Sequence, residues 1–276
     1  MEYLKLFLKG IIVGVANVIP GVSGGTMAVV CNVYDKIIGL ISFNVKKIIS
    51  SWKFWLPLVV GMGVGIVAFS KLITFLLEQY SVPTIYFFEG LVAGSIPLIL
   101  RKAKGAASEK GAKIPMEVAC FLVGFAIMIL MLVLKDDSAK ENATAISEVN
   151  ATVLALVFVS GVAAAVAMII PGISGSFLLL VLGMYGTIIA AVSDMNVMIL
   201  CPLALGALVG LFAGAAFVRL LMEKVPSYTY CLILGLVAGS IVTIFPGIPS
   251  GVVIAVSAAT FALGFSAAYF SSRGEK

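Results

Sequence analysis

Two short proline–glycine segments, each inside an otherwise apolar run, constrain the fold of this chain more than any other feature. Residues 19–26 read Ile-Pro-Gly-Val-Ser-Gly-Gly-Thr, and residues 170–177 read Ile-Pro-Gly-Ile-Ser-Gly-Ser-Phe. Proline breaks the helix that precedes it, and glycine permits the tight backbone turns that follow. In hydrocarbon such a break is tolerated only where protein buries it or where it lines a wet cavity. The pair therefore predicts two intramembrane breaks, with helix-packing kinks made by small residues as the alternative.

The composition places the chain in a membrane. Of its 276 residues, 62% are hydrophobic and 11% are charged, and the mean hydropathy is +1.19. Soluble domains carry about 25% charged residues. The sequence contains no histidine, no intramembrane pair of catalytic carboxylates and no metal-binding motif. We therefore expect no enzyme, no catalytic residue, no metal and no cofactor beyond a possible coupling H⁺ or Na⁺. The net charge of +5 belongs to loops of a membrane protein and does not indicate nucleic-acid binding.

The expected fold class is an all-α polytopic membrane protein built from two repeats. Each half is predicted to contain a Pro/Gly-broken helical hairpin followed by three transmembrane helices. The hairpin arms have roughly 14 residues, fewer than the roughly 20 needed to span a bilayer, so we expect re-entrant hairpins, with fully spanning pairs as the alternative. The predicted segments are, in the first repeat (1–134), a hairpin at 4–43 and spans at 55–77, 83–100 and 115–134; a loop at 135–150; and, in the second repeat (151–276), a hairpin at 153–193 and spans at 198–222, 228–245 and 250–270.

A second identity supports the repeat. The heptapeptide Gly-Leu-Val-Ala-Gly-Ser-Ile occurs at 90–96 and again at 235–241, in the same order relative to the breaks. Smaller matches, such as Tyr34 with Tyr185, fall between them without a gap. Chance does not readily produce an identical heptapeptide and a shared break in one order, so we interpret the chain as an internal duplication.

Loop charges predict the orientation. The stretch 101–113, expected to be a polar loop, has five basic residues and one acidic residue, whereas the loop at 135–150 has two basic and four acidic residues. Because cytoplasmic loops are enriched in Lys and Arg, we expect the first stretch inside and the second outside. An odd number of crossings per half then inverts the second repeat. Both termini are therefore expected in the cytoplasm.

The two breaks are the predicted binding site. A helix that starts inside the membrane leaves its first N–H groups without partners and adds partial positive charge there. Glycine allows a ligand to approach the backbone, and hydroxyl groups add donors. The expected ligand is a phosphate or a carboxylate. The predicted binding residues are Pro20, Gly21, Ser23, Gly24, Gly25, Thr26, Pro171, Gly172, Ser174, Gly175 and Ser176.

Four further residues are candidates for charge neutralisation or ion coupling. Glu89 lies inside a span, where an ionisable group is a functional candidate by default, but it is also close enough to Pro83 to lie solvated at the outer interface. Lys71 and Arg219 occupy corresponding spans and would either neutralise a phosphate or extend to the interface. Asn17 lies close to the first break and would either donate to a ligand or cap the hairpin.

The doubled break and the duplicated Gly-Leu-Val-Ala-Gly-Ser resemble the prokaryotic polyprenyl-phosphate transporter family over roughly residues 5–270. The resemblance implies a flippase that moves undecaprenyl phosphate, the lipid carrier of cell-wall precursors, across the cytoplasmic membrane for reuse. The partner would be this lipid, its head group held near the midplane. The residues alone leave open an ion-coupled carrier of a small soluble anion. The second motif has Ser176-Phe177 where the first has Gly25-Thr26, so the two breaks need not contribute equally.

Overall fold

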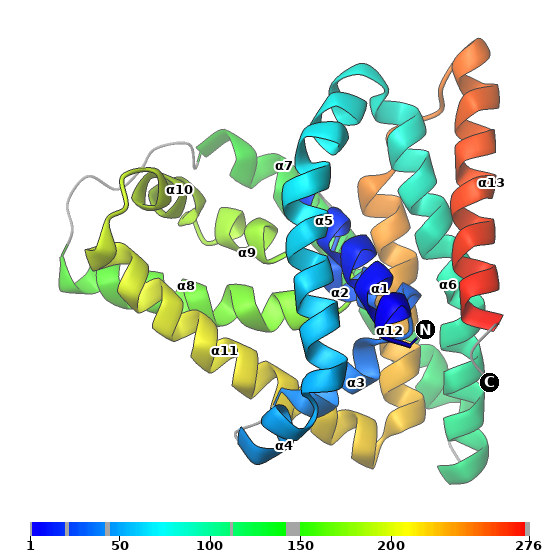
Figure 1. Ribbon diagram of the computed structural model, residues 1–276, viewed down its shortest axis with the longest axis horizontal. Coiled ribbons are helices and arrows are strands. Elements are labelled where there is room, and N and C mark those ends of the chain that lie inside the picture. The colour runs from blue at the N-terminus through cyan, green and yellow to red at the C-terminus, as the bar shows by residue number, and fades with distance from the viewer. Residues whose placement is uncertain (1, 20–21, 42–44, 111–112, 142–149, 274–276) are drawn as a thin grey trace.

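The computed structural model describes residues 2–19, 22–41, 45–110, 113–141 and 150–273, and its regular elements are all helices (Figure 1). The helices are α1 (Glu2–Val18), α2 (Gly24–Val30), α3 (Tyr34–Leu40), α4 (Val45–Ser50), α5 (Trp52–Gln79), α6 (Ser81–Lys110), α7 (Ile114–Glu141), α8 (Ala151–Ile169), α9 (Gly175–Val181), α10 (Tyr185–Ser193), α11 (Val197–Lys224), α12 (Pro226–Ile244) and α13 (Val252–Arg273). In Figure 1, α8 to α11 lie to one side of α5, and α6, α12 and α13 lie to the other.

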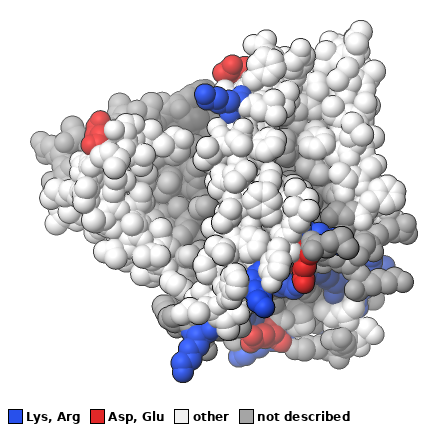
Figure 2. All heavy atoms as spheres, viewed as in Figure 1, with Lys and Arg blue, Asp and Glu red and all other residues white. Residues whose placement is uncertain are grey.

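The helices confirm an all-α membrane protein. Seven helices in the described part of the chain are long and apolar enough to cross a bilayer, and the bent pair α9–α10 would make an eighth span. The two helices of this pair meet at 116° across the short break between them. In Figure 2 the Lys, Arg, Asp and Glu atoms of the visible face lie towards its edges and its lower part, and a broad uncharged band separates them. Such a band is what the hydrocarbon of a bilayer requires.

One local prediction was wrong. The stretch 101–113 was expected to be a loop, but α6 continues as a helix through Lys110. Its Arg, Lys, Ala and Glu residues are good helix formers, so the helix extends from the apolar segment into the polar one. The returning arm of the first hairpin is divided into α2 and α3. Asn32 has a φ of 52° at this division, and asparagine tolerates this left-handed conformation better than most residues.

Glycine residues let two parallel helix pairs pack closely. In the pair α1–α5, a Cβ atom added to Gly61 would lie 2.2 Å from the backbone oxygen of Phe7. In the pair α8–α11, a Cβ atom added to Gly206 would lie 2.1 Å from the backbone oxygen of Phe158. These two contacts occupy matching positions in the two halves of the sequence. Small residues at such points let backbones approach within van der Waals contact, which is the main attraction between helices in lipid.

The remaining long helices pair across the two halves. Helix α6 packs on α13, and α12 packs on α7. A Cβ atom added to Gly90 would lie 2.2 Å from the backbone oxygen of Phe261, and one added to Gly235 would lie 2.0 Å from that of Phe121. Gly90 and Gly235 each begin a copy of the duplicated heptapeptide. The heptapeptide is therefore the surface by which each half holds a helix of the other half.

Candidate functional site

Each break follows a helix that ends abruptly. Helix α1 ends at Val18, and Ser23 is the N-cap residue of α2 with an extended backbone. Helix α8 ends at Ile169, and Ser174 occupies the N-cap position of α9 with nearly the same backbone angles as Ser23. Between them, Gly172 has a φ of +93° and lies against the backbone oxygen of Leu236. This combination of a left-handed conformation and close backbone contact favours glycine. The predicted site residues Pro20 and Gly21 lie outside the described residues.

The two breaks contact each other although some 150 residues separate them in sequence. The hydroxyl oxygen of Thr26 accepts a hydrogen bond of 2.7 Å from the backbone N–H of Gly172. The Tyr34 hydroxyl donates a 2.9 Å hydrogen bond to the backbone oxygen of Ile169. Both bonds are buried. They satisfy backbone groups that the end of α8 and the following break would otherwise leave unpaired.

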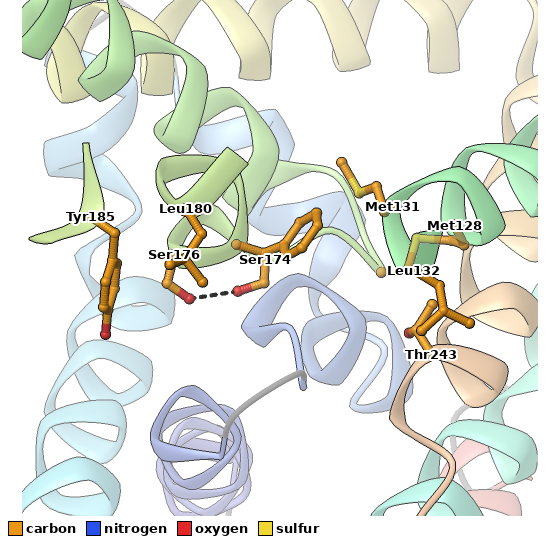
Figure 3. Close-up of a pocket in the computed structure, with 10 residues that line it drawn as sticks. Met128, Met131, Leu132, Ser174, Ser176, Leu180, Tyr185 and Thr243 are labelled. Carbon is orange, nitrogen blue, oxygen red and sulfur yellow. Dashed lines mark hydrogen bonds between the residues drawn. The ribbon is translucent and has the colours of Figure 1, made fainter. Parts of the chain in front are cut away.

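A cavity of about 240 Å³ opens beside the second break. Four hydroxyl-bearing side chains line it, and its described lining contains no Lys or Arg. The other lining residues are apolar side chains from α7 and α9, together with Gly172 of the break. Figure 3 shows Ser174 and Ser176 between Tyr185 on one side and Met131, Leu132 and Thr243 on the other. The lining residues are Met128, Met131, Leu132, Gly172, Ser174, Ser176, Phe177, Leu180, Tyr185 and Thr243.

The hydroxyls in this cavity are available to a ligand. The Oγ atoms of Ser174 and Ser176 lie 2.9 Å apart, so one donates to the other and the second proton remains free. The Ser174 side chain does not cap α9. Serine hydroxyls rotate to suit their partners. The arrangement can therefore present donors to a phosphate or carboxylate oxygen, with the apolar wall of α7 on the opposite side.

The environment of the first break differs. Ser23 and Thr26 are buried, at 6% and 2% exposure. The Asn17 carboxamide lies directly over Gly24, where an added Cβ atom would be 2.6 Å from Oδ1. In the second half, Met168 lies over Gly175 in the same way, 2.6 Å from its Cγ. The first break therefore carries an amide at the position where the second carries a thioether.

The structure does not bring the three predicted charged residues into the cavity. Glu89 is 2% exposed within α6, which excludes the solvated interfacial position. The Arg219 guanidinium donates through Nη1 to the backbone oxygen of Ile41 at 3.2 Å, so α11 holds the end of α3. Lys71 is exposed on α5 and does not line the cavity at the second break.

Sequence reasoning missed three residues of this region. Tyr34 bonds the end of α8, and Tyr185 and Thr243 line the cavity. A signal existed for the tyrosines, since each follows the last residue of its break motif by eight positions: Tyr34 follows Thr26, and Tyr185 follows Phe177.

 

That signal is the match of Tyr34 with Tyr185 in the sequence repeat. Thr243 gave no signal, because its place in the cavity beside the second break depends on how α12 packs.

Comparisons with known proteins show which family this chain belongs to. Residues 13–259 match the undecaprenyl phosphate translocase-like family. A polyprenyl-phosphate transporter of Staphylococcus aureus is 33% identical over 94% of this chain and 92% of its own length. A polyprenyl-phosphate transporter of Vibrio cholerae is 30% identical over 89% of this chain and 79% of its own length. Both relatives are named as transporters, and neither is named as an enzyme. No solved structure matches the chain.

Proposed function

Since the chain belongs to the undecaprenyl phosphate translocase-like family, we propose that it carries undecaprenyl phosphate across the cytoplasmic membrane, so that the lipid carrier can be reused. The observation that carries this proposal is the contact between the two breaks, Thr26 to Gly172, beside a cavity lined by hydroxyls. A membrane protein has little reason to bury two helix breaks against each other unless they serve a polar ligand.

In this proposal the phosphate head group binds at the second break. Ser174 and Ser176 donate to phosphate oxygens, and the first N–H groups after the break add donors. Gly172 lets the backbone approach the ligand, and Pro171, Gly175 and the corresponding residues of the first break shape the turn. Asn17 and Ser23 would meet the head group on the side of the first break. The first break contributes less, because its Thr26 already holds Gly172.

A second cavity supports a lipid rather than a soluble anion as the substrate. It has a volume of about 610 Å³ and lies between the pairs α1–α5 and α6–α13. Its lining is almost entirely apolar and includes Ile11, Phe69, Phe87 and Val256. Such a groove suits part of a prenyl chain, whereas the rest of the chain stays in the bilayer. A carrier of a small soluble anion has no use for it.

The proposed topology is an inverted repeat with both termini in the cytoplasm. Parallel packing of α1 on α5 supports the return of the first hairpin to its starting side, because both helices then start on one side of the membrane. The chain must return to that side through α2 and α3 before α5 begins. The parallel pair α8–α11 supports the same argument for the second hairpin. An odd number of crossings per half then gives the two halves opposite orientations.

Purified protein in liposomes with undecaprenyl phosphate tests the function. We expect protein-dependent movement of the phosphate head group between leaflets. An impermeant reagent that reacts only with head groups in the outer leaflet measures this movement. A folded protein that leaves the head group in place, but exchanges a labelled soluble phosphate or carboxylate, would favour the small-anion carrier instead.

The double variant Ser23→Ala, Ser174→Ala tests the binding site. We expect at least a tenfold slower head-group movement, because two donors at the breaks are lost (each hydrogen bond to a charged group is worth about 1.5–3 kcal/mol). Membrane insertion and folding should persist. Ser108→Ala, at an exposed position near the end of α6, is the matched control. Transport at the wild-type rate by the well-expressed double variant would contradict the proposed site.

A further inference from the structure

We infer that Glu89 binds and releases the proton that couples this transporter to the proton gradient, an inference that rests on the proposed function. The Glu89 side chain is 2% exposed within α6. Its Oε1 atom has no hydrogen-bond partner among the described residues. An unpaired carboxylate in apolar surroundings carries a large desolvation cost, whereas the neutral acid carries a much smaller one. In the state described here, Glu89 is therefore protonated.

The helices packed on α6 supply no counter-charge. Helices α2, α12 and α13 contain no Asp, Glu, Lys or Arg within 24–30, 226–244 and 252–270. The titratable residues of these ranges are Tyr228, Tyr230, Cys231 and Tyr269. Helix α5 also touches α6, and its charged residues Lys53, Lys71 and Glu78 are all exposed.

Helix α6 itself brings no cation to the level of Glu89. Its first basic residue, Arg101, follows twelve residues later, which is about 18 Å along a helix. Nothing described around Glu89 therefore stabilises its charged form in this state. The carboxyl can lose its proton only when a rearrangement brings water or a cation to it.

The surroundings suit a proton rather than Na⁺. Sodium sites in transporters use several oxygen ligands, often carbonyls from unwound helix segments. Helix α6 is continuous from Ser81 to Lys110, so its carbonyls beside Glu89 are engaged in the helix, apart from that of Ala93, whose donor position is occupied by Pro97. Within the described part of the chain, no group of three or more His, Cys, Asp or Glu residues could hold a metal ion. A proton needs only the carboxyl group.

The two halves differ at this position, which gives one coupling group per molecule. Glu89 immediately precedes the first copy of the heptapeptide, and Leu234 immediately precedes the second. Helix α6 also packs directly against α2, the helix that follows the first break. A change in the charge of Glu89 is therefore transmitted to a helix next to the proposed head-group site.

Liposomes with an imposed pH gradient test the inference. If one proton moves with each lipid, a gradient of one pH unit sustains up to about a tenfold ratio of head groups between leaflets. We expect wild-type protein and Glu78→Gln, an exposed carboxyl on α5, to build up such a ratio. Glu89→Gln should still equilibrate the lipid but give a ratio near one. An equal response of Glu89→Gln and wild type would overturn the inference and leave the proposed function intact.

A binding measurement covers the case in which Glu89→Gln does not transport. The dissociation constant of detergent-solubilised protein for undecaprenyl phosphate is measured at pH 6 and pH 8. We expect wild type to depend more strongly on pH than Glu89→Gln, whose remaining dependence reflects the phosphate. Identical dependence in both proteins would overturn the inference, as would a wild-type response to a Na⁺ gradient alone. Wild-type protein that neither binds nor moves the lipid would instead reject the proposed function.

Discussion

Thr26 shows how much a single side chain contributes to the joining of the two halves. Its hydroxyl accepts from the Gly172 N–H at 2.7 Å, and its side chain is buried. Phe177 takes the matching place in the second motif and lines the cavity instead. The same position in the two repeats has thus become a structural bridge in one half and an apolar wall in the other.

Thr26→Val should destabilise the protein, because it keeps the shape of the side chain but removes the acceptor. The buried Gly172 N–H would then lack its partner, at a cost of about 1–3 kcal/mol. Thr26→Ser keeps the hydroxyl and serves as the control. Thermal unfolding in detergent measures both variants. Equal midpoints for Thr26→Val and Thr26→Ser would contradict the bridging role.

At the scale of helices, the sequence could predict the elements better than their partners. Hydropathy and length identify apolar spans, and Pro20 and Pro171 mark where helices end. The pairing of α6 with α13 depends instead on close backbone approach at Gly90 and Gly264, which no periodicity reveals. The Asp35 carboxylate likewise accepts from Lys102 at 2.5 Å and from the Tyr230 hydroxyl at 3.0 Å. In the sequence, Asp35 is simply the first charged residue after a long uncharged stretch.

Two glycines of α5 test the packing of helices. Gly61→Ala places a methyl group 2.2 Å from the Phe7 backbone oxygen, so α1 and α5 must separate. We expect a loss of about 1–3 kcal/mol, as for an overpacked core. Gly63→Ala, two residues away, meets nothing within 4 Å and should be neutral or slightly stabilising. Unfolding in detergent compares the two, and equal stabilities would refute close packing at Gly61.

At the scale of the whole molecule, the proposed orientation determines which exposed positions face each compartment. Met195, between α10 and α11, is 72% exposed and should face the outside. Ser108, near the end of α6, is also exposed and should face the cytoplasm. The two positions therefore test the inverted repeat independently of transport.

Cysteine labelling in whole cells measures this orientation. In a protein whose exposed Cys201 is replaced by serine, an impermeant thiol reagent should label Met195→Cys. It should label Ser108→Cys only after the cells are opened. The reverse pattern would invert the proposed topology, and labelling of both in intact cells would reject the assigned sides.

The exchange of helices between halves also affects how the chain is made. Thr260 of α13 bonds the backbone oxygen of Pro83 in α6 at 2.8 Å, across a separation of 177 residues. At synthesis rates of about 5–20 residues per second, roughly ten to thirty seconds pass between the synthesis of Pro83 and that of Thr260. Until then the glycine face of α6 is exposed to lipid or to the insertion machinery. Completion of the native structure must therefore await the synthesis and insertion of α13.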